Sequence, residues 1–157
     1  MMLNLVYIAL GSNLGDREQY IEKAIGYLND HEDIEVTQFS DLIETKSDSS
    51  FSQPDYLNAV IECKTFLSCR ALFEFTNQVE MNLNRVNKGD KDPRTIDLDL
   101  LFFNQDIIAD DDLVVPHPMC HERDFVLVPL NQIASDLKHP VLGESIKQLS
   151  SKFTGIV

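Results

Sequence analysis

Residues 92–103 of the chain read DPRTIDLDLLFF, in which apolar and polar side chains alternate before a continuous apolar run. Alternation with a period of two predicts a β-strand. Its apolar face would carry Ile96, Leu98 and Leu100, and its polar face Thr95, Asp97 and Asp99. Aspartate is depleted in strands, so two on one face indicate either a solvated sheet face or a site for a hard cation such as Mg²⁺. From this strand alone the two interpretations are equally supported.

The segments before this strand predict its partners in a sheet. They read as a buried strand at 5–10, a helix after Asp16, a strand at 34–45, a strand at 57–65 and a helix after Ser68. The resulting order β-α-β-β-α-β is that of an α+β, ferredoxin-like fold, an antiparallel sheet with both helices on one face. A short strand at 107–108 and helical or irregular segments at 125–130 and 146–149 would cover part of the other face. We expect one domain spanning residues 1–157.

Local signals support these elements. Asp16 is followed three residues later by Gln19, as in a capping box, and Ser68 can cap the second helix. In the strand at 34–45, Val36 and Phe39 are expected in the core.

The composition limits the kinds of partner and the cellular location that we expect for the protein. The chain has 157 residues and a formal net charge of −13, which argues against a broad surface for nucleic acid or for an anionic membrane. No apolar run reaches the ~20 residues that span a bilayer. Three cysteines without a CxxC pair and a start without a secretory signal favour a cytoplasmic protein with reduced thiols.

The basic residues are unevenly distributed. Arg85, Lys88, Lys91 and Arg94 lie within ten residues, directly before the aspartate pair. Such a local cluster indicates a small, highly charged anion, although basic runs are commonly only solvated loops. Its position beside the aspartates favours the anion site.

Other polar residues could complete a small-molecule site. Tyr56 and Asn58 would share one side of their strand, where Tyr can stack on a flat heterocycle and Asn can bind its edge. Asn77 and Glu80 share the polar face of the second helix. His117 and Arg123 are candidate phosphate contacts. For each group a partly exposed polar surface is the alternative, and a transition-metal site at His117, Cys120 and His121 lacks a supporting cysteine pattern.

Four segments together resemble the 6-hydroxymethyl-7,8-dihydropterin pyrophosphokinase family. They are, in the order and at nearly the spacing of that family, IALGSNLG at 8–15, QPDYLN at 53–58, PRTIDLD at 93–99 and PHP through ERDFVL at 116–127. The resemblance implies transfer of pyrophosphate from ATP to the hydroxymethyl group of the pterin, with release of AMP, in folate biosynthesis. It also implies two Mg²⁺ ions and ATP as co-substrate. Separately, we expect a monomer.

The resemblance assigns roles to residues of this chain. Asp97 and Asp99 would bind the metal ions and, with Arg85 and Arg94, form the catalytic group. The pterin would be held by Thr45, Tyr56, Asn58 and Phe125. The nucleotide would be bound by Asn77, Glu80, Arg85, Lys88, Arg94, His117 and Arg123.

The chain departs from the family pattern in several places, including Asn87, where a basic residue is common, and residues 46–48, where prolines and a leucine are usual. Residues 87–92 form a shorter segment without the tryptophan that the family usually has there, and Asp110, Asp111 and Asp112 add negative charge before His117. These departures motivate the alternative of a catalytically weakened or inactive pterin- or nucleotide-binding relative.

Overall fold

The computed structural model describes residues 2–45, 55–83 and 95–154 of the chain. The elements are β1 (Asn4–Ser12), α1 (Arg17–Asp30), β2 (Ile34–Phe39), β3 (Ile43–Thr45), β4 (Tyr56–Thr65), α2 (Cys69–Asn82), β5 (Asp97–Phe103), β6 (Ile108–Ala109), β7 (Val114–Val115), the 3₁₀ turn η1 (Cys120–Glu122), α3 (Asp124–Ala134) and α4 (Ile146–Thr154). Among the described residues no helix is long and apolar enough to cross a membrane.

The main sheet confirms the ferredoxin-like α+β prediction. Its strands follow the order β2-β4-β1-β5, with β3 pairing with β4, and every pair is antiparallel. β1 is therefore central, and β5, which carries the two aspartates, lies at one edge. The predicted caps also form: the side chain of Asp16 accepts from the N–H of Gln19, and that of Ser68 from the N–H of Ala71.

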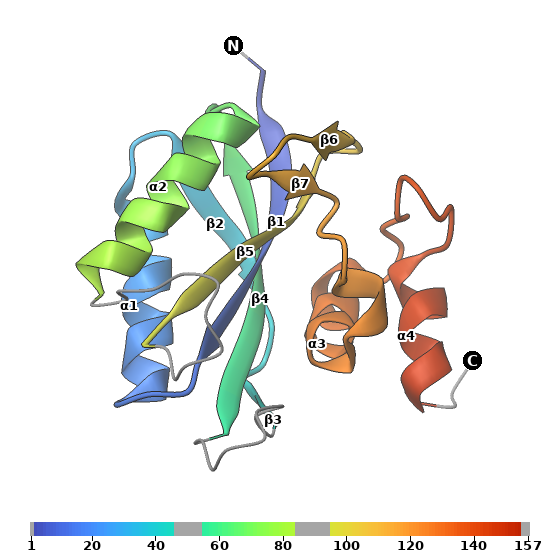
Figure 1. Cartoon of the computed structure of the whole chain (residues 1–157), viewed down its shortest axis with the longest axis horizontal. Coiled ribbons are helices and arrows are strands. Elements are labelled where there is room, and N and C mark those ends of the chain that lie inside the picture. The colour runs from blue at the N-terminus through green and yellow to red at the C-terminus, as the bar shows by residue number, and fades with distance from the viewer. Residues whose placement is uncertain (1, 46–54, 84–94, 155–157) are drawn as a thin grey trace.

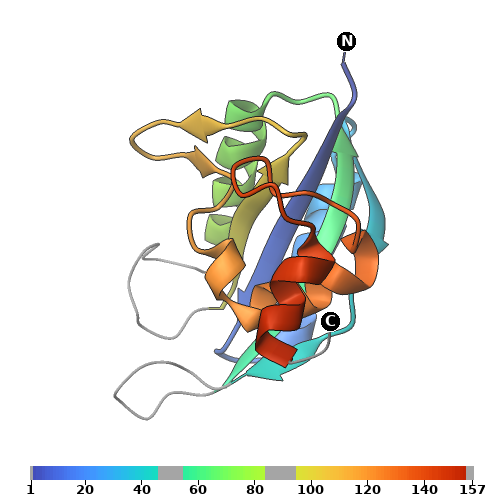
Figure 2. The same ribbon diagram turned by 90° about the vertical axis from the view of Figure 1, so that its right-hand side faces the viewer.

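Two apolar cores lie on the two faces of the sheet. α1 and α2 cover one face, and α3 and α4 cover the other, as Figure 1 shows from the side and Figure 2 from the front of α4. The first core contains Ile8, Leu10, Leu72 and Leu98, and the second contains Val60, Phe102 and Leu127 among others. The C-terminal third therefore covers the face that a bare ferredoxin-like sheet would leave open.

A register shift in β5 turns two consecutive side chains of this strand toward the same core. The pairing with β1 runs Ile8↔Leu100 and then Tyr7↔Phe102, so Leu101 is the extra residue of a bulge. Before the shift, Leu98 and Leu100 face the first core, whereas Leu101 and Phe102 both belong to the second. Asp97 and Asp99 alternate with Leu98 and Leu100 and therefore lie on the face that α3 and α4 partly cover.

Two predictions about the strand at 34–45 were wrong. The strand is divided into β2 and β3 because Ser40 bonds to Val60 twice: its N–H donates to the Val60 carbonyl at 2.9 Å, and its hydroxyl accepts from the Val60 N–H at 2.9 Å. Phe39 is 72% exposed, because it ends an edge strand, beyond a register shift between Val36 and Gln38. Val36 does pack against the first core, as expected.

A buried carboxylate lies between the sheet and the C-terminal helices. Glu62 is 8% exposed and accepts hydrogen bonds from Tyr7 Oη at 2.6 Å, Thr37 Oγ1 at 2.7 Å and Gln38 Nε2 at 3.0 Å. Burial alone would raise the pKa of Glu62, but these hydrogen bonds together hold it below its ordinary value. The same contact and burial raise the pKa of Tyr7.

Because of Glu62, we expect the folded protein to lose stability in acid. Because its pKa is lower in the folded protein, Glu62 stabilises the protein above the ordinary pKa of 4.5, and this contribution is lost as the pH falls below it. Glu62→Gln should therefore lower the free energy of unfolding at pH 7 by about 1–3 kcal/mol. Urea unfolding of both proteins at pH 7 and pH 4 checks this. The two proteins share every other carboxylate. If their free energies of unfolding fell by the same amount between pH 7 and pH 4, the assigned role of Glu62 would be wrong.

Candidate active site

A row of four residues crosses the sheet at the end where β1 finishes. Gly11 of β1 pairs with Asp97 of β5 on one side and with Asn58 of β4 on the other, and Asn58 pairs with Ile43 of β3. Residues directly opposite one another in antiparallel strands point to the same face. The aspartate of the edge strand and the amide of β4 therefore lie on one face, separated by a glycine.

Gly11 keeps the centre of this row open. A Cβ atom at this position would lie 3.4 Å from Oδ1 of Asn58 and 3.7 Å from Cδ1 of Tyr56. The contact also shows that Tyr56 and Asn58 lean over Gly11, so the sequence prediction that they share one side of β4 is confirmed. The role of Gly11 was missed from the sequence, where the first strand was predicted to end at residue 10, whereas β1 continues to Ser12. A glycine inside a strand, which indicates a close approach, was the available signal.

The amide of Asn58 is held in one orientation. Asn58 is 6% exposed, and its Nδ2 donates to Oγ1 of Thr45 at 2.8 Å and to the Ile43 carbonyl at 3.3 Å. This fixes Oδ1 over Gly11, on the side of the aspartates. Thr45 therefore contributes to the candidate pterin site by orienting the side chain of Asn58. An amide held in one orientation is suited to bind the polar edge of a flat ring.

Asp97 and Asp99 form an acidic pair at the start of β5. Both side chains are half-buried and stand two residues apart on one face. Among the described residues no group of three or more His, Cys, Asp or Glu could hold a metal ion. Two carboxylates nevertheless fit Mg²⁺, which keeps several waters and is commonly bound by one or two carboxylates together with substrate phosphates. The two carboxylates thus suit a Mg²⁺ ion that is also bound by the phosphates of a nucleotide. They are too few to bind a metal ion by protein ligands alone.

The helix α2 brings two further candidates to the outer edge of β5. Glu80 is 2% exposed, and its Oε2 accepts from the backbone N–H of Leu98 at 2.6 Å. Asn77 lies one turn earlier on α2. Within the described part of the chain, Oδ1 of Asn77 and Oγ1 of Thr95 are buried and have no hydrogen-bond partner. Buried polar atoms are rarely left unpaired, so both atoms are candidates for ligand contacts.

The segment after β7 supplies His117, Arg123 and Phe125. The N–H of His117 donates to the Leu101 carbonyl at 3.0 Å, at the bulge of β5, which ties this segment to the aspartate strand. Its Nδ1 accepts from the N–H of Met119 at 3.1 Å, so a neutral imidazole carries its proton on Nε2. The guanidinium carbon of Arg123 lies 5.6 Å from the centroid of the Phe125 ring, at the start of α3. α3 packs on β3 and β4, the strands that bear Thr45 and Asn58.

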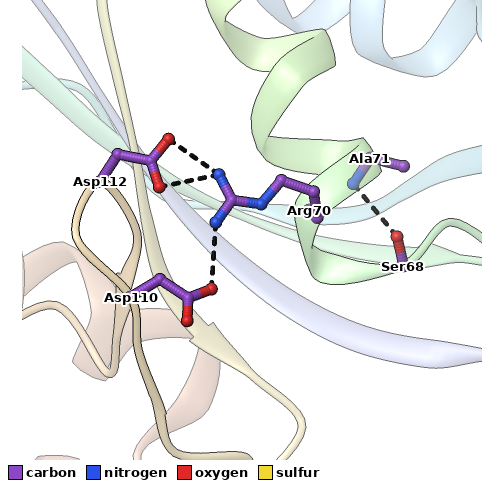
Figure 3. A network of polar contacts seen from close by, with 5 residues as sticks. All are labelled: Ser68, Arg70, Ala71, Asp110 and Asp112. Carbon is purple, nitrogen blue, oxygen red and sulfur yellow. Dashed lines mark hydrogen bonds and ion pairs between the residues drawn. The ribbon is translucent and has the colours of Figure 1, made fainter.

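The negative charge of the segment before His117 is partly neutralised. Arg70, near the N-terminus of α2, donates from Nη1 to both carboxylate oxygens of Asp112 at 2.8 Å and from Nη2 to Asp110 at 3.0 Å, as Figure 3 shows. The sequence placed this acidic run beside the phosphate contacts as a disadvantage. In the structure, Asp110 and Asp112 instead attach the β6–β7 hairpin to α2 through Arg70.

Three predicted site residues lie outside the described residues: Arg85, Lys88 and Arg94. The structure brings Asp97, Asn58, Thr45 and Tyr56 to one end of one sheet face, with Phe125 on the helix above that face. Glu80 of α2 contacts the start of β5 through Leu98, and Asn77 lies one helical turn before Glu80. The roles of these residues stay predictions.

Comparison with known proteins identifies a family that matches most of the chain. A family model described as 7,8-dihydro-6-hydroxymethylpterin-pyrophosphokinase (HPPK) matches residues 7–135. The chain is 43% identical over 137 residues to the 2-amino-4-hydroxy-6-hydroxymethyldihydropteridine pyrophosphokinase of Bacillus subtilis (strain 168), covering 87% of this chain and 82% of the relative. The Aquifex aeolicus protein of the same name is 36% identical over 149 residues, covering 95% of this chain and 92% of the relative.

A solved structure shows the same fold. The Plasmodium falciparum HPPK-DHPS crystal structure with pteroate matches with a TM-score of 0.78 at 16% identity. The match covers 98% of this chain but only 43% of the solved chain, so this chain is similar to less than half of that protein. At this identity the likeness supports the fold alone.

Proposed function

The chain belongs to the 7,8-dihydro-6-hydroxymethylpterin-pyrophosphokinase (HPPK) family. From this premise we propose which of its residues bind ATP, which bind Mg²⁺ and which bind the pterin. As a member of the family it is a pyrophosphokinase of folate biosynthesis. It transfers pyrophosphate from ATP to the hydroxymethyl group of 6-hydroxymethyl-7,8-dihydropterin and releases AMP.

The row Asp97–Gly11–Asn58 is the observation that carries the proposed division. It supports this division because the carboxylate of Asp97 and the amide of Asn58 lie on one sheet face with a glycine between them. Adjacent strands are ~4.8 Å apart, so the two functions are about 10 Å apart across two strand spacings. That separation suits a pterin bound at Asn58 whose hydroxymethyl group points toward phosphates held at Asp97.

The pterin side consists of Thr45, Tyr56, Asn58 and Phe125. Asn58, oriented by Thr45, binds the polar edge of the ring, and Tyr56 and Phe125 pack on its apolar surfaces. A site built around a fixed buried amide rejects rings that lack the matching polar groups, because the amide would then be left unpaired. Specificity for the pterin is thus assigned to β3, β4 and the start of α3.

The phosphate side consists of Asp97 and Asp99 with the basic residues. Mg²⁺ bound at the two carboxylates, in the two-ion form that we propose, would neutralise the phosphate oxygens and activate the attacking hydroxyl. Arg85, Lys88, Arg94, His117 and Arg123 would hold the phosphates, since phosphoryl transfer depends mainly on positioning and charge neutralisation. Asn77 and Glu80 are placed on the nucleotide side.

The test of this function is product formation. The purified chain is incubated with ATP, Mg²⁺ and 6-hydroxymethyl-7,8-dihydropterin, and nucleotides and pterins are separated by chromatography. We expect AMP and the pterin pyrophosphate in equal amounts, and no product without Mg²⁺. A folded sample that binds the pterin but gives no AMP would instead favour the inactive relative that the altered segment at 87–92 suggests.

A substitution at Gly11 tests the proposed pterin side. Gly11→Val adds methyl groups to a Cβ that already lies 3.4 Å from Oδ1 of Asn58, so it displaces that amide or Tyr56. We expect pterin affinity to fall about tenfold or more, corresponding to about 1.4 kcal/mol or more. Gly11→Ala is the matched control, because a single Cβ makes an ordinary contact. Calorimetry with the pterin checks both variants, and equal affinities for all three proteins would contradict the placement of the ring.

Three broader expectations complete the proposal: one domain spanning residues 1–157, a monomer and a cytoplasmic location. Cys63, Cys69 and Cys120 are all free and buried, and burial raises the pKa of the Cys63 thiol to about 12, which supports a protein built for reduced thiols. Light scattering after gel filtration checks the monomer.

A further inference from the structure

We propose that Glu80 is a positioning residue for the metal-binding pair: it fixes the start of β5 through the backbone of Leu98, the residue between Asp97 and Asp99. The proposal rests on the proposed function, which assigns the metal to these two carboxylates. It gives Glu80 a role different from the nucleotide contact that the family resemblance implies.

The position of β5 explains why its start needs an additional contact, which we call the Glu80 anchor. Among the strands that the structure describes, β5 lies at the edge of the sheet and pairs with β1 alone. In an antiparallel edge strand, the N–H groups point alternately toward the neighbouring strand and away from it. The N–H of Leu98 donates to Glu80 and so points away from β1, which leaves those of Asp97 and Asp99 on the β1 side. Glu80 thus takes the place that a further strand would occupy.

The strength of the contact fits this role. The bond from Leu98 N to Oε2 of Glu80 is 2.6 Å long, and Glu80 is 2% exposed. This N···O distance is shorter than that of most N–H···O hydrogen bonds in proteins, and burial removes the competition from water. The Leu98 side chain is itself 1% exposed in the first core. Backbone and side chain together hold Leu98 in place, and its two neighbours project onto the opposite face.

The helix α2 is well suited to carry this anchor. Its C-terminal half carries Glu80, and near its N-terminus Arg70 binds Asp110 and Asp112 of the hairpin that follows β5 (Figure 3). The segment from β5 to β7 is thus attached to α2 at two points, one buried at the aspartate pair and one exposed at the hairpin. This arrangement supplies a matched control, because Arg70→Ala loosens the same helix without touching Leu98.

The experiment compares Glu80→Gln, Glu80→Leu and Arg70→Ala with the wild type. Glutamine keeps an acceptor for Leu98, and leucine keeps apolar volume but has none. Binding of Mn²⁺ together with a non-hydrolysable ATP analogue is measured by calorimetry. We expect Glu80→Leu to weaken metal binding about 10–100-fold, the usual effect of removing a group that orients a metal ligand. Glu80→Gln should recover metal affinity to within about threefold of the wild type, and Arg70→Ala should leave it unchanged.

Amide hydrogen exchange gives a readout that is independent of turnover. In the wild type and in Glu80→Gln the Leu98 amide should be protected, and in Glu80→Leu it should exchange at least about tenfold faster. If Glu80→Leu retained both wild-type metal affinity and Leu98 protection, or if Glu80→Gln lost metal affinity as fully as Glu80→Leu, the positioning role would be wrong. An inactive wild type with these same amide and metal results would overturn the proposed function but not the anchor.

Discussion

Asp97→Asn should reduce turnover about 10³-fold while leaving the protein folded. The loss is of the order found when one preorganised charge-stabilising group is removed from an active site. Asp97 is half-buried at the start of an edge strand, and asparagine matches it in size, so the sheet keeps its packing. Replacing one of two neighbouring carboxylates also removes a like-charge repulsion that is present whenever metal is absent. Steady-state rates at saturating ATP and pterin, with a thermal melt of each protein, measure both effects.

The pair of variants at 97 and 99 sharpens this prediction. Asp99→Asn should cause a loss of the same order, because both carboxylates project from one face of β5. Asp106→Asn, in the turn after β5, is the matched control and should leave turnover unchanged. The metal assignment would be wrong if either active-site variant retained near-normal turnover, or if its activity depended on Mg²⁺ concentration in the same way as that of the wild type.

Asn58→Leu should weaken pterin binding about 10²-fold, which corresponds to about 2.7 kcal/mol. The amide is buried, and its Nδ2 is bonded to Thr45 and Ile43, so its carbonyl oxygen is presented in a fixed orientation over Gly11. Leucine fills a similar volume but leaves the polar edge of the ring unpaired. Calorimetric titration with the pterin, alone and with a non-hydrolysable ATP analogue and Mg²⁺, measures the loss.

The partner of Asn58 provides the control for that result. Thr45→Val removes the hydroxyl that orients the amide but leaves the amide itself, so we expect a smaller loss of about tenfold, or about 1.4 kcal/mol. Binding of the ATP analogue without pterin should be unchanged in both variants. A pterin affinity in Asn58→Leu close to that of the wild type would place the ring elsewhere on the sheet.

The sequence predicted the fold well wherever a periodic pattern coincided with a buried face. Ile96, Leu98 and Leu100 alternate with the two aspartates, and all three are in the first core. The helix caps at Asp16 and Ser68 depend only on residues close together in the sequence, and both form as predicted. The same pattern could not locate the register shifts in β2 and β5, because a bulge depends on the paired strand.

Parts of the candidate site depend on contacts between distant segments. Tyr56 and Asn58 could be placed on one side of a strand from their spacing, but their approach over Gly11 requires the β1–β4 register. Glu80 was expected to bind the nucleotide, and its bond to the Leu98 backbone joins residues 18 positions apart. The pairing of Arg70 with Asp110 and Asp112, 40 and 42 positions away, likewise has no signature in the sequence.

The fate of the β-phosphorus of ATP tests the central claim most directly. The protein is supplied with ATP labelled at the β-phosphorus, Mg²⁺ and 6-hydroxymethyl-7,8-dihydropterin, and the labelled products are separated. Transfer of an intact pyrophosphoryl group predicts that all transferred label is found in the pterin product, with an equal amount of unlabelled AMP. Label that remains in ADP while the pterin gains a single phosphate, or label released only as free pyrophosphate, would contradict the account.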